Sequence, residues 1–578
     1  MAKFVIRDEE RYMVDLQAKP FHLDDEGMKW VKDTLAAMDL TAKVGQLFCP
    51  IGFTDDKEQL AKLTQKMRIG GILYRPGPGE KVQETHRFLQ DTSEIPLLIA
   101  ANLEAGGNGS TVDGTFFGKQ LQVAATDNTE MARRLGVIAA REGSAVGANW
   151  AFAPVVDIDI NFRNPITNVR TFGSDPDRVA RMSKAYTTAV QELGMAVSIK
   201  HFPGDGVDER DQHLVTSINS LSVEEWDATF GSVYQDCIDA GALSVMVGHI
   251  AQPAYSRQLR PEIPDSDIMP ATLAPELLND LLRGKLGFNG LITTDATPMA
   301  GFMMAMKRET AVPASIAAGC DMFLFNKSIE EDFFFMMKGI ETGILTVERV
   351  DEAVTRILGV KASLGLHKMK REGTLVPGVE ALSVLKCDEH LRWAEECADQ
   401  SVTLVKDTQQ LLPISPDHHK RILLFSLGGE DGLFKSTNIA PYFISKMEAE
   451  GFEIKIFDSK NFDFRTMFAG VKAMSDQYDA AIYFSNFETH SNQTTVRINW
   501  APPYGLDMPW FIQELPTMFI SVANPYHLLD VPRIPTFINA YSASEHVVDA
   551  IIEKLLGRSS FKGINPVDPF CGYWDTRL

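Results

Sequence analysis

Short apolar runs alternate with amphipathic stretches along the first two thirds of the chain. Stretches such as 130–142, 177–193 and 274–286 carry apolar residues at helical spacing. This alternation is typical of parallel strands joined by crossover helices, and eight such units predict a (β/α)8 TIM barrel. The predicted strands are 44–49, 70–74, 96–101, 150–156, 195–199, 243–247, 290–294 and 321–325.

A second series of strand-like runs begins after a helical stretch at 391–400. It also alternates with helical patterns, notably 444–450 and 544–556, which predicts an open, mostly parallel α/β sandwich. The whole chain is therefore predicted to be α/β, with a barrel domain at 1–375, a sandwich domain at 390–578 and a boundary near 365–390. The predicted strands of the second domain are 402–405, 421–426, 453–457, 479–484, 518–522 and 536–540.

Composition supports a folded protein and argues against two classes of partner. Of the 578 residues, 45% are hydrophobic and 23% charged, so there is enough material for a core. The 77 acidic residues outnumber the 56 Lys and Arg residues, giving a net charge of −21. With no basic stripe to neutralise phosphodiesters, nucleic acid and anionic membranes are not expected to bind.

The cysteine pattern indicates a reducing compartment. Six cysteines are scattered without a C-x-x-C pair, which fits neither a disulfide framework nor a zinc site. The N-terminal stretch lacks a continuous apolar segment, and no later run is long enough to span a bilayer. We therefore expect a soluble, cytoplasmic protein.

Polar residues follow the predicted barrel strands at their C-terminal ends, where the loops of such a barrel converge on one mouth. Asp295 directly follows a wholly apolar strand, and a carboxylate held there suits a nucleophile. The same Asp-Ala-Thr-Pro segment also resembles a helix start, so an N-cap role is an equal alternative from position alone. The candidates gathered by this rule are Asn102, Glu104, Asp157, Asp159, Arg170, Lys200, His201, Asp211, Gln212, His213 and Asp295.

Asp211 and His213 form the second element of candidate chemistry. In an extended loop, residues two apart point the same way, so the carboxylate can fix the imidazole tautomer. Such a pair can exchange a proton near neutral pH, although a lone D-x-H pattern is usually a surface feature. Lys200 and His201 can hold ligand hydroxyls or form a salt bridge in the barrel mouth. The nearby G-x-G lacks the spacing of a nucleotide fingerprint.

The segment KHFPGDGVDERDQH, at 200–213, resembles the K-H-[FS]-P-G-[HD]-G-x4-D-[ST]-H signature of family 3 glycoside hydrolases, in their β-N-acetylglucosaminidase-like branch. NLEAGG, NVRTFGSDP and GLITTDATPMAG resemble further blocks of that family in the same order. The similarity covers essentially the whole chain, including the sandwich, and the branch includes retaining β-glycoside phosphorylases.

The resemblance implies roles for the candidates. Asp295 would form a covalent glycosyl ester, and His213, supported by Asp211, would act as general acid/base, giving net retention of the β configuration. Substrate-binding positions would be Lys200, His201, Arg170, Gln212, Asn102 and Glu104. No metal and no organic cofactor is implied, and inorganic phosphate would be a co-substrate.

Two positions depart from the family pattern. The usual D-Q-E-G-G reads Asn102-Leu-Glu104-Ala-Gly-Gly, so contact to distal sugar hydroxyls passes to an amide or to Glu104. Gln212 replaces a Ser or Thr, and its long amide would fill the space of a 2-acetamido group and bond a 2-hydroxyl. A β-glucoside is therefore the favoured donor, unless Gln212 turns to solvent.

The acceptor is open between phosphate and water. A carboxylate acid/base would repel phosphate, whereas a neutral imidazole would not, so phosphorolysis is physically available. The leading prediction is a retaining β-glycoside phosphorylase. The alternatives are a retaining exo-β-N-acetylglucosaminidase or β-glucosidase that uses water, and, more distantly, an inactive sugar-binding protein. A homodimer is compatible with the chain's size. Candidate phosphate ligands are Arg170, His490, Asn492 and Arg497.

Overall fold

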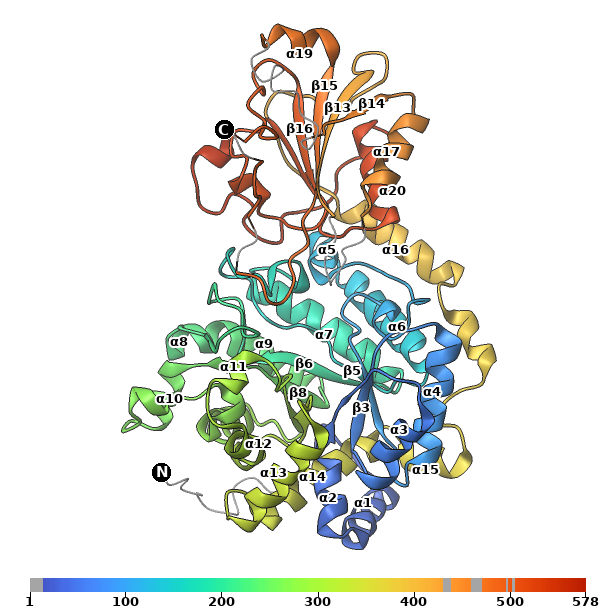
Figure 1. The fold of residues 1–578 in the computed structure, drawn as a ribbon, viewed down its shortest axis with the longest axis vertical. Helices are drawn as coiled ribbons and strands as arrows, with labels where there is room; N and C mark the ends of the chain where they lie inside the picture. Colours follow the sequence, from blue (N-terminus) through green and yellow to red (C-terminus); the bar gives the residue numbers. More distant parts are fainter. Residues whose placement is uncertain (1–13, 430–437, 459–469, 495–496, 502–504) are drawn as a thin grey trace. The chain divides into compact units, whose positions relative to one another are not determined.

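The computed structural model describes residues 14–429, 438–458, 470–494, 497–501 and 505–578, which divide into two compact units (Figure 1). Unit 1 consists of the described part of Met1–Thr115 together with Ala132–Ile158 and Val179–Cys387. Unit 2 consists of Phe116–Met131, Asp159–Arg178 and the described part of Asp388–Leu578. Two segments from the first third of the chain thus belong with the C-terminal unit.

Unit 1 is built on a curled parallel sheet that closes into a barrel. Among the described residues, seven strands pair in the order β2-β3-β4-β5-β6-β8-β10. The ring closes because β1 pairs with β11, Thr293 at β10 bridges Met322, and β1 and β2 are separated only by Pro50. The strands are β1 (Phe48–Cys49), β2 (Ile51–Gly52), β3 (Gly71–Tyr74), β4 (Leu98–Ala101), β5 (Trp150–Ala151), β6 (Ala196–Phe202), β8 (Ser244–Val247), β10 (Leu291–Thr294) and β11 (Phe323–Leu324).

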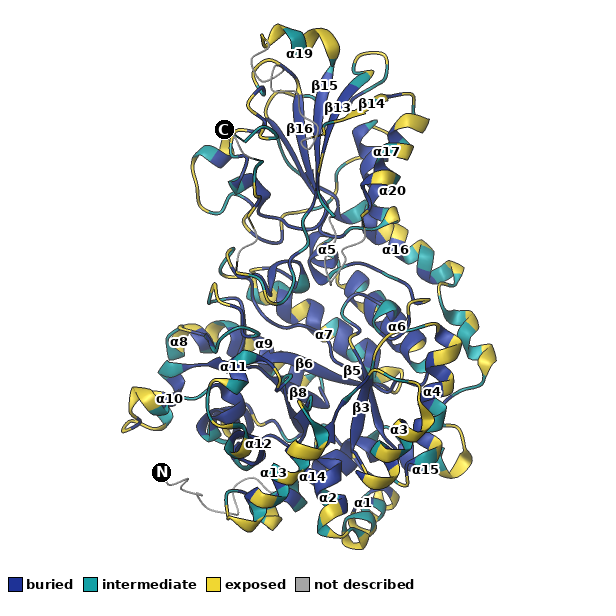
Figure 2. Ribbon diagram, viewed as in Figure 1, coloured by how far each residue is buried: buried dark blue, intermediate teal, exposed yellow. Residues whose placement is uncertain are grey.

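Helices connect these strands and surround the barrel, as the ribbon shows (Figure 1). The strands are almost wholly buried, while the exposed residues of unit 1 gather on helices and loops (Figure 2). The helices are α1 (Asp25–Ala37), α2 (Leu40–Gln46), α3 (Lys57–Ala61), α4 (Gly79–Thr92), α6 (Thr129–Ala145), α7 (Pro176–Glu192), α8 (Val223–Trp226), α9 (Ser232–Asp239), α10 (Pro253–Leu259), η7 (Glu276–Lys285), α11 (Ala300–Met303), α12 (Arg308–Ala318), α13 (Ile329–Glu341), α14 (Val347–Ser363) and α15 (Leu366–Glu372).

The predicted barrel is confirmed, with two corrections to its strands. Residues 44–46 are not strand but the end of α2, which begins after Asp39, whose carboxylate caps the Ala42 N–H. The strand predicted at 150–156 is interrupted after Ala151. Pro154 has no N–H to contribute to a ladder, and beyond it pairing resumes only as a single bridge between Val155 and Lys200. In the other direction, β6 runs on through Phe202, so Lys200 and His201 lie within the strand.

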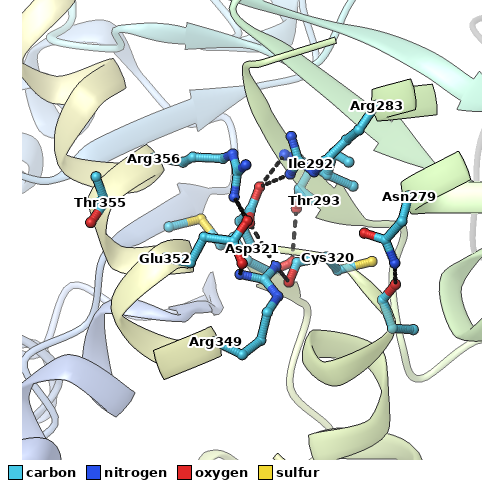
Figure 3. A network of polar contacts seen from close by, with 12 residues as sticks. Asn279, Arg283, Ile292, Thr293, Cys320, Asp321, Arg349, Glu352, Thr355 and Arg356 are labelled. Carbon is cyan, nitrogen blue, oxygen red and sulfur yellow. Dashed lines mark hydrogen bonds and ion pairs between the residues drawn. The ribbon is translucent and has the colours of Figure 1, made fainter. Parts of the chain in front are cut away.

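A buried ionic network fastens the closing strand β11 (Figure 3). Asp321 is fully buried, and its carboxylate lies 2.7 Å from the guanidinium groups of both Arg283 and Arg349 and 3.5 Å from that of Arg356. It also accepts the backbone N–H of Ile292, on β10, at 2.9 Å. Burial raises the pKa of Asp321, but the three arginines lower it more, and the net pKa lies below its usual value. Asp321 therefore ties three arginines to the seam between β10 and β11.

Unit 2 contains a six-stranded sheet in the order β12-β17-β16-β15-β13-β14, among described residues, with only β12 antiparallel to its neighbour. Apolar clusters cover both faces, which confirms the predicted α/β sandwich. The strands are β12 (Thr403–Asp407), β13 (Arg421–Gly428), β14 (Glu453–Ile456), β15 (Ala480–Asn486), β16 (Thr517–Ser521) and β17 (Thr536–Asn539). The helices are α5 (Gln120–Ala125), α16 (Asp388–Ser401), α17 (Ala440–Ala449), α19 (Lys472–Gln477) and α20 (Glu545–Leu555).

The two early segments of unit 2 share a small core with its C-terminal part. Leu121 and Val169 are buried in one cluster with Tyr526, Tyr541 and Val567. The Tyr526 hydroxyl donates to the Asp159 carboxylate at 2.5 Å. These segments are therefore held by side chains that lie hundreds of residues later in the chain.

Across the described residues, we find no helix with the length and apolarity that a membrane span requires.

Candidate active site

Asp295 directly follows β10, where its backbone N–H donates to Val247 O at 2.8 Å and its carboxylate accepts the Ala296 N–H at 2.7 Å. Its side chain is 13% exposed. Burial raises the pKa of this carboxyl, but the imidazoles of His201, His249 and His213 outweigh that effect, and the net pKa is below the usual value. Asp295 is thus an ionised, rigidly held carboxylate, as a nucleophile must be.

The predicted dyad is formed. Asp211 is fully buried at its side chain, and its Oδ1 lies 2.7 Å from His213 Nδ1 and accepts the His213 backbone N–H at 2.8 Å. His213 itself is 25% exposed at its side chain. Because Asp211 occupies Nδ1, Nε2 is the nitrogen that can exchange a proton with a ligand.

Lys200, on β6, and Glu104, in the segment after β4, come together although β5 lies between their strands. Lys200 Nζ lies 2.7 Å from Glu104 Oε1, and both side chains are mostly buried. Asn102, in contrast, is exposed just beyond β4. Of the two residues predicted to replace the family's aspartate, Glu104 is therefore the one that joins the lysine.

The loop that carries Glu104 is anchored by a buried carboxylate on α6. Glu142 accepts the backbone N–H and the hydroxyl of Thr115, each at 2.6 Å. A Cβ on Gly107 would lie 2.0 Å from Glu142 Oε2, so only glycine permits this approach. The glycines of the NLEAGG block thus serve the loop's geometry.

Asp157 holds His201 from two directions. Its Oδ2 lies 2.7 Å from His201 Nδ1, and its Oδ1 accepts the backbone N–H of His201 at 3.0 Å and that of Asp205 at 2.8 Å. His201 Nε2 in turn lies 3.9 Å from Asp295 Oδ2. A chain of three side chains therefore leads from the segment after β5 to the candidate nucleophile.

Gln212 is fully buried and does not turn to solvent. Its Oε1 accepts the His249 backbone N–H at 2.8 Å, and its Nε2 donates to Asp205 Oδ2 at 3.2 Å. This fixes which way round the amide lies, because a backbone N–H can only donate and a carboxylate can only accept. Gln212 is thus a rigid part of the wall beside His213.

His249 contributes a second fixed imidazole. Its Nε2 lies 3.0 Å from the Ala296 carbonyl and its Nδ1 3.1 Å from the Thr272 hydroxyl. Burial lowers the pKa of His249, and the negative charge of Asp295 offsets this effect only in part. A neutral ring that donates from Nε2 to the carbonyl satisfies both contacts, and it steadies the residue next to Asp295.

Four predicted ligands lie in unit 2 and, where their contacts are described, are engaged there. Arg170 ends the short turn η3 (Asn168–Arg170) in that unit. Arg497 Nε pairs with Asp530 at 2.5 Å, and the His490 backbone N–H donates to Gln493 Oε1 at 2.9 Å. Asn492 is exposed, with its side-chain amide 3.2 Å from Ser491 Oγ.

Sequence reasoning missed His249 and Asp205 as site residues and gave Asp157 no role. The signal for His249 was present, since it follows the predicted strand 243–247 by two residues and the strand-end rule applies to it. Asp205 stood inside the recognised motif, where it looked like part of a glycine-rich turn. Across the described residues, no group of three or more His, Cys, Asp or Glu side chains is arranged to hold a metal ion.

Comparison with known proteins identifies the family of this chain. Residues 39–360 match the glycosyl hydrolase family 3 N-terminal domain. A Cellulomonas fimi protein described as a beta-N-acetylglucosaminidase/beta-glucosidase is 48% identical over 569 residues, 98% of this chain and 100% of that protein. The chain belongs to glycosyl hydrolase family 3.

Solved structures of the family extend the similarity over both units. A structure described as beta-glucoside phosphorylase BglX has a TM-score of 0.92 and 45% identity, covering 97% of this chain and 99% of its own. The same protein has also been solved bound to 2FGlc. A Paenibacillus β-N-acetylglucosaminidase at 22% identity, with a TM-score of 0.77 over 93% of this chain and 100% of its own, supports the fold alone. The protein is thus an enzyme with the β-glycosidase activity of family 3.

Proposed function

We propose that this enzyme is a retaining β-glycoside phosphorylase that transfers a β-glucosyl group from a glucoside to inorganic phosphate. The observation that carries the proposal is the acid/base: an imidazole, His213, supported by the buried Asp211 at 2.7 Å. The 45% identity to a beta-glucoside phosphorylase over nearly the whole chain supports the same choice.

In the first step, an Asp295 oxygen attacks C1 of the donor while the glycosidic C–O bond breaks. His213 gives its Nε2 proton to the leaving oxygen, and the Asp211 carboxylate stabilises the protonated ring before transfer. The product is a glycosyl ester of Asp295 with inverted configuration.

In the second step, a phosphate oxygen attacks C1 and the bond to Asp295 breaks. A carboxylate in the place of His213 would oppose the phosphate by about 4 kcal/mol per unit charge at 4 Å and an effective dielectric of 20. Neutral His213 carries no such penalty, and it regains its proton from the bound phosphate. Two inversions give a β-configured sugar 1-phosphate.

The favoured donor follows from Gln212. Its amide is fixed by Asp205 and the His249 backbone, and neither contact uses its second N–H, which under this proposal donates to the oxygen of a 2-hydroxyl. The same side chain occupies space that a 2-acetamido group would need. Since the Cellulomonas fimi relative is described with both activities, a β-N-acetylglucosaminide donor, with water or phosphate as acceptor, is the second candidate.

The reaction needs no metal or organic cofactor under this proposal, because carboxylates and an imidazole supply every proton and bond change. All six cysteines are free, in keeping with a cytoplasmic location, which we also propose.

The test uses 2,4-dinitrophenyl β-glucoside and its 2-acetamido analogue, each with and without millimolar phosphate, with the sugar product identified by NMR. Phosphate-stimulated turnover to a β-sugar 1-phosphate is expected, with the glucoside preferred. Release of free sugar at a rate independent of phosphate would contradict the proposal.

A variant sharpens the test of the histidine's role. His213→Glu places a carboxylate where phosphate must enter, so it should lose the stimulation by phosphate while keeping turnover with water. Equal stimulation in His213→Glu and wild type would refute the electrostatic argument.

A further inference from the structure

An exposed aromatic residue and an exposed cation stand together on the barrel rim, outside the site described above. Phe53 directly follows β2 and is 74% exposed. Arg75 directly follows β3, and its guanidinium carbon lies 5.5 Å from the centroid of the Phe53 ring. Among the described residues, the Arg75 side chain makes no ion pair.

Strand alternation determines which way this pair faces. Gly52 and Tyr74 are register partners, and Tyr74 packs edge-on against His86 of the surrounding helix α4, at 5.6 Å between ring centroids. Successive residues of a strand point to opposite faces, so Phe53 and Arg75 lie on the side away from α4. That side is the barrel interior, and because both residues come after the carboxyl ends of their strands, they lie at the barrel mouth.

The order of strands places the pair across the mouth from the sugar-binding candidates. Counting round the closed ring, the β1/β2 position is four strands from β6 in either direction, and β3 is four strands from β8. Phe53 therefore lies opposite Lys200 and His201, and Arg75 lies opposite the end of β8, which is followed by His249.

The chemistry of a pyranose ring links the two sides. Under the proposed function, on which this inference rests, Gln212 meets the C2 side of the donor. C5 lies across the ring from C2, so the C5 substituent points toward Phe53 and Arg75. We propose that this pair reads the C5 substituent, with Phe53 packing on the C6 methylene and Arg75 donating to the C6 hydroxyl.

The functional consequence is selection of hexosides over pentosides. A β-xyloside has hydrogen in place of the hydroxymethyl group, so it makes neither contact. One methylene buried against an aromatic ring corresponds to about a four-fold preference, and a hydrogen bond from a charged donor to about ten-fold or more.

The experiment compares kcat/KM for 4-nitrophenyl β-glucoside and 4-nitrophenyl β-xyloside, which share a leaving group. We expect Phe53→Ala to lower the glucoside/xyloside ratio about four-fold and Arg75→Met about ten-fold, with Arg75→Lys partly restoring it. Phe334→Ala is the matched control, because Phe334 is also exposed, at 60%, but lies on the outer helix α13. It should leave the ratio at its wild-type value.

Other outcomes overturn the inference. If Phe53→Ala instead changes the ratio between 4-nitrophenyl β-glucoside and β-glucosyl fluoride, the ring serves the leaving group. If neither ratio changes, the pair lies outside the substrate's reach.

A failure of the proposed function would be seen separately, in the turnover of the wild type, before any variant is compared. If the wild type prefers N-acetylglucosaminides, the same comparison is made between the N-acetylglucosaminide and its 6-deoxy counterpart. An unchanged ratio in Arg75→Met then overturns the inference for that donor.

Discussion

A buried lysine in the barrel unit should make the protein more stable in mildly alkaline solution. Lys361, on α14, is fully buried, and its Nζ donates to Gln46 Oε1 at 2.7 Å. Burial lowers its pKa to about 7, and the neighbouring Cys49 adds no charge because burial raises the pKa of that thiol. Lys361→Met removes the amine while keeping most of the side-chain volume.

The size and sign of the effect follow from proton linkage. The unfolded chain keeps the lysine proton up to about pH 10.4, whereas the folded chain loses it near pH 7, so between these values the unfolded state binds one more proton. Stability therefore rises with pH across this window, by about 1.4 kcal/mol per unit. From about pH 7 to about pH 10, the wild type should gain about 4 kcal/mol relative to Lys361→Met.

The assay is urea unfolding of both proteins at closely spaced pH values, followed by circular dichroism. We expect Lys361→Met to be the more stable protein at neutral pH and to lose its advantage as the pH rises. Lys29→Met is the control, since Lys29 is 75% exposed. The difference in unfolding free energy between Lys29→Met and wild type should stay constant over this pH range. If the free energy of unfolding changed with pH in the same way in wild type and Lys361→Met, the reasoning would be refuted.

Three further substitutions test the site and the fold. Asp295→Ala should lower kcat at least about 10⁴-fold, measured as dinitrophenol release, because under the proposed mechanism Asp295 forms the covalent ester; activity within ten-fold of wild type would exclude Asp295 as nucleophile. Asp211→Asn should slow glycosides with basic leaving groups about 10²–10⁴-fold but dinitrophenyl glycosides little, since only the former need a proton from His213; equal loss on both would show a structural defect. Asp321→Asn should cost about 3–5 kcal/mol in urea unfolding, because it removes the carboxylate partner of the buried Arg283, whereas Arg349 and Arg356 keep Glu352; a cost below about 1 kcal/mol would mean that the network contributes little.

The sequence predicted the parts of the fold that depend on local pattern. Strand runs such as 243–247 and 290–294 appear in the structure within a residue or two, because a buried parallel strand needs a continuous apolar run. The strand predicted at 44–49 was wrong over residues 44–46, because the apolar spacing of a short helix and that of a strand overlap. The Asp39 cap determines that a helix forms there.

Contacts between distant residues could not be predicted in the same way. The pairing of Asp211 with His213 follows from their spacing, but that of Lys200 with Glu104 depends on how β4 and β6 lie on either side of β5 in the folded barrel. Gln212 could be recognised as unusual, yet its fixed orientation rests on Asp205 and on a backbone N–H of His249. Burial of Lys361 is likewise invisible in a sequence where most lysines are solvated.

Unit 2 is made of segments that lie far apart in the sequence, so its early segments are synthesised long before the residues they pack against. Val169 shares its apolar cluster with Val567, which the ribosome adds about 400 residues later. At about 5–20 residues per second, roughly 20–80 s pass before that partner exists. During synthesis, residues 116–131 and 159–178 therefore wait with apolar side chains such as Leu121 and Val169 uncovered, and these are the segments of the nascent chain where a chaperone would find its binding sites.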